Sequence, residues 1–164
     1  MSTRCQYGIF SEDFCYQDPE RASEASVLLY RHSDGMPDRA VTQILPFLRQ
    51  FILAGQKGRR DWGAEYLGAR LLQFMCNQYD EQMRIIHKRT PPSGFTLGEA
   101  LVIGYGIEQE LHGDEEFFYA IRRQPKGCVV EVWDIPKVNW SGDFKDAKLV
   151  KKTLVDVAEQ EKAK

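Results

Sequence analysis

The sequence has no cysteine pair in a C-x-x-C spacing, no long apolar run and no large excess of one charge. Its four cysteines are scattered over the chain, so neither a zinc ribbon nor a thioredoxin-like motif is present. Reduced thiols in a cytoplasmic protein are the simpler interpretation. The first ten residues do not combine a basic segment with an apolar one, and we expect no signal peptide. No apolar run reaches the length of a membrane span.

The usual signatures of enzyme families are missing as well. There is no G-x-S-x-G elbow, no P-loop and no H-E-x-x-H motif. The pair Gly104 and Gly106 lacks the third glycine of a dinucleotide-binding fingerprint. A net charge of −2 provides no general attraction to nucleic acid or to an anionic membrane. The sequence therefore identifies no enzyme class by motif.

What the chain does contain is enough apolar sequence for one core. It has 164 residues, of which 43% are hydrophobic, and this predicts a single domain over residues 1–164. Alternating or continuous apolar residues predict strands over 4–10, 24–32, 115–123 and 128–135, with a strand or bend over 101–111. Helical spacing predicts a helix that starts near Pro46, a second from Asp61 to about Lys88 and a last one over 144–160.

The order of these elements indicates the fold class. Strands lie on both sides of a helical pair, which is typical of an α+β fold. We expect a mostly antiparallel sheet of about five strands, with the two central helices and the C-terminal helix packed on it. The pairing of 115–123 with 128–135 through the turn "QPKG" is the firmest hairpin.

The segment "YRHSDGMP" (30–37) has two interpretations. Asp34-Gly35 is a common turn pair, so this segment can simply bend the chain from the second strand toward the first helix. Alternation along a strand also places Tyr30, His32 and Asp34 on one face. Histidine titrates near neutral pH, and a nearby carboxylate can orient it or share a metal with it.

The segment "HGDEEFFYAI" (112–121) repeats the H-x-D spacing. His112 and Asp114 are followed by two more carboxylates, which could attract a cation or form a solvated acidic loop. If the two segments face each other, His32, Asp34, His112 and Asp114 are candidate catalytic residues and candidate ligands of Zn, Mn or Fe. We expect His32 to lie within hydrogen-bond or one-water reach of Asp114 or Glu116.

A third segment, "GQKGRRDW" (55–62), is basic with one aromatic residue. Lys57, Arg59, Arg60 and Trp62 could bind phosphate or nucleic acid. A solvated connection between two helices explains the same residues, and we expect no nucleic-acid partner.

Three blocks together resemble a family of small uncharacterised proteins from bacteria and their phages. These blocks are "STRC" at 2–5, "YRHSDGMP" and "HGDEEFFYAI". The matching residues are Ser2, Thr3, Arg4, His32, Asp34, Gly35, Pro37, His112, Gly113, Asp114, Glu116 and Tyr119. Met36 and Cys5 depart from the family pattern, which has Tyr and Ala there. The resemblance implies candidate residues and a bacterial or phage origin, but it implies no activity.

Two functions follow as hypotheses. The first is a phage- or mobile-element-associated binding protein that acts on a host protein or a small ligand. Its target could be a component of host defence, which would make the protein a counter-defence factor. Its candidate binding residues are Tyr30, Arg31, Glu116, Tyr119, Arg59, Arg60 and Trp62. The second is a hydrolase-like enzyme that uses the His/Asp cluster, with or without a divalent metal as cofactor. The sequence leaves the oligomeric state open.

Overall fold

The computed structural model describes residues 3–11, 25–32, 34–58, 63–87, 104–111, 114–124, 127–136 and 146–156. Within these ranges the chain forms six strands and two helices. In chain order they are β1 (Cys5–Phe10), β2 (Val27–Arg31), α1 (Pro37–Gly58), α2 (Ala64–His87), β3 (Tyr105–Glu108), β4 (Phe117–Gln124), β5 (Gly127–Asp134) and β6 (Lys148–Asp156).

The strands form one sheet in the order β3-β2-β1-β4-β5-β6. Neighbouring strands are antiparallel except for β1 and β4 at the centre, which run parallel. The predicted α+β class is confirmed, but the sheet is mixed and has six strands in the described residues instead of about five. The predicted hairpin is confirmed as β4 and β5, with Phe117 opposite Asp134 and Gln124 opposite Gly127.

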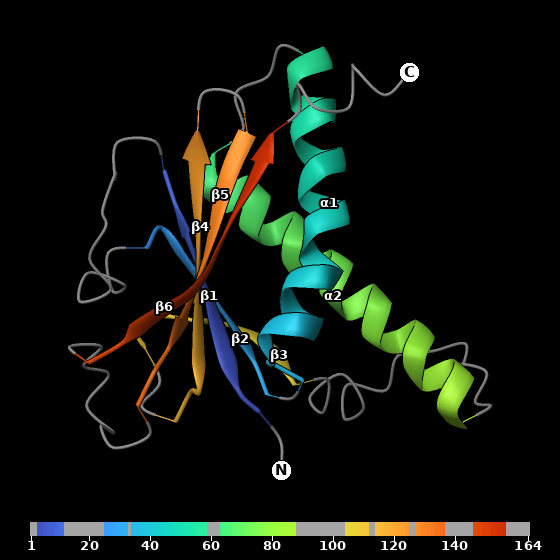
Figure 1. The fold of residues 1–164 in the computed structure, drawn as a ribbon. Helices are drawn as coiled ribbons and strands as arrows, with labels where there is room; N and C mark the ends of the chain where they lie inside the picture. The colour runs from blue at the N-terminus through green and yellow to red at the C-terminus, as the bar shows by residue number, and fades with distance from the viewer. Residues whose placement is uncertain are drawn as a thin grey trace.

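Both helices lie on the same face of the sheet (Figure 1). Helix α1 packs over β5 and β6, and α2 packs over β1, β2 and β3. Each helix buries one apolar stripe whose residues are three or four positions apart. The stripes are Ala40, Val41, Ile44, Leu48 and Ile52 in α1, and Ala64, Leu67, Leu71 and Met75 in α2. Neither of these two helices is long and apolar enough to cross a membrane.

A second, smaller apolar cluster lies on the other face of the sheet. It contains Phe10, Leu28, Phe118, Ala120, Trp133 and Ile135. Successive residues of a strand point to opposite faces, so Leu28 joins this cluster while Leu29 joins the main core under the helices. The continuous apolar run of β2 therefore reflects burial on both faces of the sheet.

The segment predicted as a final helix is strand β6 in its described part. It pairs with β5 from Lys148 opposite Asp134 to Asp156 opposite Gly127. Val150 and Leu154, two apolar residues of the predicted helix, are 55% and 61% exposed. The edge of β5 offers backbone partners along its whole length, and this pairing outweighs the helix propensity of lysine and leucine. The prediction of a helix over 144–160 was wrong there.

Helix α1 begins at Pro37 and not near Pro46. Proline suits the first helical position, and Asp38 in the first turn interacts favourably with the positive end of the helix dipole. Pro46 lies inside the helix, where its missing N–H leaves the carbonyl of Thr42 without the usual donor. Burial of apolar side chains such as Ile44 in the preceding turn offsets this cost.

Candidate functional site

The three motif blocks meet at Gly35. Its N–H donates to the carbonyl oxygen of Thr3 at 2.9 Å. Its own carbonyl oxygen accepts a hydrogen bond from the Tyr119 hydroxyl at 2.6 Å. Thr3 belongs to the first block, Gly35 to the second and Tyr119 to the third. Segments far apart in the sequence are therefore joined at one end of the sheet.

Asp34 and Gly35 turn the chain from β2 into α1, as the motif predicted. Asp34 has a φ of 58°, in the left-handed region that aspartate and asparagine tolerate best after glycine. A Cβ at Gly35 would lie 2.9 Å from Sγ of Cys5 and 3.0 Å from the carbonyl oxygen of Thr3. Glycine is therefore required by the close approach of this turn to β1.

The two H-x-D segments flank Arg4 at this end of the sheet. The carbonyl oxygen of Arg4 accepts a hydrogen bond from the N–H of Glu116 at 3.0 Å, and its guanidinium forms an ion pair with Asp114. On the other side of β1, Nδ1 of His32 lies 3.2 Å from the hydroxyl oxygen of Tyr30. The structure therefore brings Asp114 and Glu116 to the same end of the sheet as His32, with the start of β1 between them.

This arrangement separates the backbones of the two segments. Strand β1 lies between β2 and β4, and two strand spacings amount to about 10 Å. His32 is exposed, and His112 lies outside the described residues. Within the described ranges, no group of three or more His, Cys, Asp or Glu residues could hold a metal ion. The shared site of His32, Asp34, His112 and Asp114 stays a prediction.

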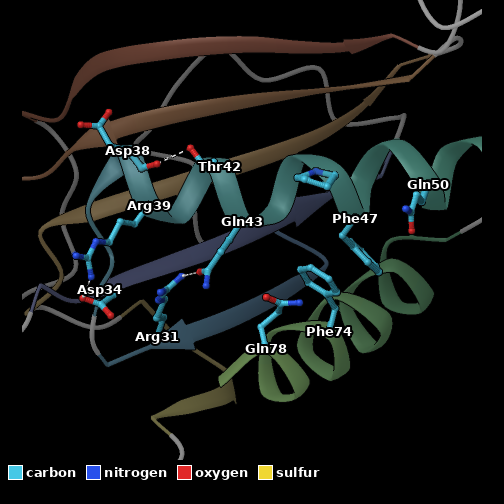
Figure 2. Close-up of a pocket in the computed structure, with 11 residues that line it drawn as sticks. Arg31, Asp34, Asp38, Arg39, Thr42, Gln43, Phe47, Gln50, Phe74 and Gln78 are labelled. Carbon is cyan, nitrogen blue, oxygen red and sulfur yellow. Dashed lines mark hydrogen bonds and ion pairs between the residues drawn. The ribbon is translucent and has the colours of Figure 1, made fainter. Parts of the chain in front are cut away.

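On the helix side of the sheet, a groove of about 600 Å³ opens between α1, α2 and the end of β2 (Figure 2). Its volume lies in the range of small-ligand sites in proteins. Two residues of the turn motif line it, Arg31 and Asp34. The helices contribute the remaining lining residues, which are Asp38, Arg39, Thr42, Gln43, Pro46, Phe47, Gln50, Phe74 and Gln78.

Arg31 lies at the inner end of the groove and is only 3% exposed. Its Nη1 donates to Oε1 of Gln43 at 2.7 Å and to the Tyr7 hydroxyl at 3.3 Å. Its guanidinium carbon lies 5.6 Å from the centre of the Tyr105 ring, a cation–π contact. Burial opposes the charge, but interactions with Tyr7 and Tyr105 prevail and raise the pKa of Arg31. The groove thus contains an oriented, permanent positive charge.

Aromatic rings and amides surround this charge. Phe47 of α1 and Phe74 of α2 stack with ring centroids 5.0 Å apart, and they form an apolar wall where the helices meet. Gln43, Gln50 and Gln78 add amide groups, each of which can both donate and accept hydrogen bonds. An apolar wall with a few polar groups is typical of a ligand site.

The acidic residues of the groove lie at its rim. The carboxylate of Asp34 is 3.2 Å from the guanidinium of Arg39, and both side chains are largely exposed. Figure 2 shows Asp38 pointing away from Arg31 and out of the groove. The inner part of the groove therefore carries the positive charge of Arg31, whereas the rim carries two carboxylates and one guanidinium.

The other predicted binding residues have different outcomes. Tyr119 is fully buried and its ring stacks on Tyr7 with centroids 4.9 Å apart, so its contacts hold the fold together. Arg59, Arg60 and Trp62 lie outside the described residues, and their role stays a prediction.

Sequence reasoning missed most of the groove. The sequence did not identify Gln43, Gln50, Phe47 or Phe74 as candidate binding residues. Arg39, Gln43 and Gln50 do recur along one face of α1. That polar stripe beside the apolar stripe was the available signal. A solvated helix face gives the same pattern, so the stripe alone does not indicate a binding site.

Because two cysteines are buried, we expect the fold to lose stability at alkaline pH. Burial raises the pKa of the Cys5 and Cys128 thiols from 9.0 to about 12. The folded state then holds these protons more tightly than the unfolded state. The resulting contribution to the free energy of unfolding is therefore complete below pH 9 and is lost as the pH rises toward 12. We expect urea denaturation to show a falling free energy of unfolding over this interval.

The variant Cys128→Ala tests the cause of that fall. Removing one buried thiol should make the decline between pH 9 and 12 shallower than in the unaltered chain. An equally steep decline in the variant would assign the alkaline loss to other groups.

No protein-family model, no curated protein and no solved structure matches this chain.

Proposed function

We propose that this chain is a binding protein whose groove between α1 and α2 takes a small ligand with an anionic group and a flat ring. The observation that carries the proposal is the buried guanidinium of Arg31, held at the inner end of that groove by Tyr7 and Gln43. A guanidinium matches the geometry of a carboxylate or phosphate group. The rings of Phe47 and Phe74 suit the flat part of such a ligand.

Preorganisation supports binding in preference to a purely structural role for this arginine. Fixing a long side chain on binding costs about 0.5–1.5 kcal/mol. Here Gln43 and Tyr7 already hold the guanidinium, so a ligand would not bear that cost. The turn at Asp34 and Gly35 leads directly from Arg31 into α1, which fixes the groove wall relative to its charge.

The resemblance to proteins of bacteria and phages supports a host molecule as the target. In this proposal the ligand is a host metabolite or signal, and its capture is a means of counter-defence. A host protein that presents a carboxylate beside an aromatic side chain fits the same chemistry.

Isothermal titration calorimetry with matched probes tests the groove. The probes are nucleoside monophosphates and aromatic carboxylates, each compared with its uncharged nucleoside or amide. We expect Arg31→Gln to weaken binding of the anionic probes by roughly 10- to 150-fold, because hydrogen bonds to charged groups contribute about 1.5–3 kcal/mol. The uncharged probes should lose little.

Arg39→Gln is the matched control, since Arg39 lies at the exposed rim in an ion pair with Asp34. It should change the affinity less than about threefold, as expected for an exposed pair. Arg31→Lys keeps the charge without the planar fork and guards against misfolding of the glutamine variant. Equal binding by the Arg31 and Arg39 variants, or no binding of any probe, would refute the proposal.

A further inference from the structure

Strand β6 is at one end of the sheet order and pairs on one side with β5. In the described part of the chain, no strand lies beyond it. Three of its apolar side chains are exposed: Leu149 at 47%, Val150 at 55% and Leu154 at 61%. An edge strand of nine residues with exposed apolar side chains is a template for another strand.

The charges of β6 determine what kind of strand fits. Its lysines are Lys148, Lys151 and Lys152, and all three are exposed. Lys152 also contacts Oε1 of Glu131 on β5 at 3.0 Å, which holds the middle of the strand to the sheet. Antiparallel pairing of two copies centred on Lys151 or Lys152 would place lysine against lysine, and like charges directly opposite are unfavourable.

From these observations we propose that β6 is the docking strand for an extended acidic segment of a partner protein. The segment adds beside β6 through main-chain hydrogen bonds. Its carboxylates lie opposite Lys151 on the helix side of the sheet, and its apolar side chains cover Leu149 and Leu154 on the other side. This surface is separate from the groove and does not depend on the function proposed there.

The probe is a nine-residue synthetic peptide that alternates glutamate and valine, and its counterpart carries lysine in place of glutamate. Calorimetry should detect binding of the glutamate peptide alone, with an affinity that falls as salt is added. Hydrogen exchange should show added protection in β6 when the peptide is bound.

Lys151→Glu should weaken binding of the glutamate peptide at least tenfold. The control Arg49→Glu makes the same charge change at an exposed position of α1 and should leave binding unchanged. Equal loss in both variants, binding of both peptides, or no binding of either would overturn the proposal. So would sedimentation showing that the chain forms dimers that Lys151→Glu abolishes, since the occupant would then be a second copy.

Discussion

Replacing Glu131 by glutamine is expected to lower the free energy of unfolding by about 3–5 kcal/mol. The Glu131 carboxylate on β5 lies 3.1 Å from the guanidinium of Arg122 on β4, and these side chains are only 6% and 10% exposed. The substitution keeps the shape but removes the negative charge. Arg122, which also lies over the ring of Phe10, then keeps a charge that little solvent reaches. Urea denaturation at neutral pH measures the loss.

Asp34→Asn is the matched control for that experiment. It also converts a carboxylate to an amide within an ion pair, but Asp34 and Arg39 are 53% and 72% exposed. Asparagine tolerates the positive φ at this position, so we expect a change below about 1 kcal/mol. Similar losses in the two variants would mean that burial does not set the strength of the Arg122–Glu131 pair.

Gly35→Ala should destabilise the fold by about 1–3 kcal/mol, the usual range for overpacking a tight interior. The added methyl group would lie 2.9 Å from both Cβ and Sγ of Cys5, and Cys5 is fully buried in the central strand. Relief requires the turn to move away from β1. That movement stretches the hydrogen bonds from Gly35 to Thr3 and from Tyr119 to Gly35.

Gly106→Ala separates this effect from the general effect of replacing a glycine. At Gly106 the nearest atom to an added Cβ is Oε1 of Glu108 at 4.0 Å, which is ordinary contact. There we expect no loss, or a gain of up to about 1 kcal/mol from the reduced entropy of the unfolded chain. If Gly35→Ala behaves like Gly106→Ala, the turn is not packed against β1 as described.

The fold was predictable where the sequence pattern had one interpretation. The hairpin of β4 and β5 combines alternating apolar residues with a turn signal, and both strands formed as predicted. Helix α2 has a long apolar stripe without proline, and its start and end lie close to the prediction. Local signals suffice when the propensity and the periodicity agree.

The errors lie where a distant part of the chain decides the outcome. The segment that forms β6 contains residues that suit a helix. No signal in the neighbouring sequence indicates that one edge of β5 is available for pairing. The start of α1 was placed too late because the cost of Pro46 is visible in sequence, whereas the compensating burial of Val41 and Ile44 is not. Tertiary packing overrides propensity at both places.

Only part of the candidate site was predictable from the sequence. The turn at Asp34 and Gly35 follows from residue type, and Arg31 was already a candidate for binding. Its neighbours in the groove come from α1 and α2, and their side chains look like ordinary helix surface in the sequence. Only the register of β2 with β1 shows that Arg31 lies on the face of the sheet that the helices cover.

The parallel pairing of β1 with β4 has a consequence for the order of folding. It joins Cys5 to Phe117, so the chain must close a very long loop before the centre of the sheet exists, and such closure slows folding. The pairing of β4 with β5 needs only a short turn, and β6 can extend it as a local meander. We therefore expect these three strands to form first, with β1 entering late and the contacts at Gly35 completing the native state.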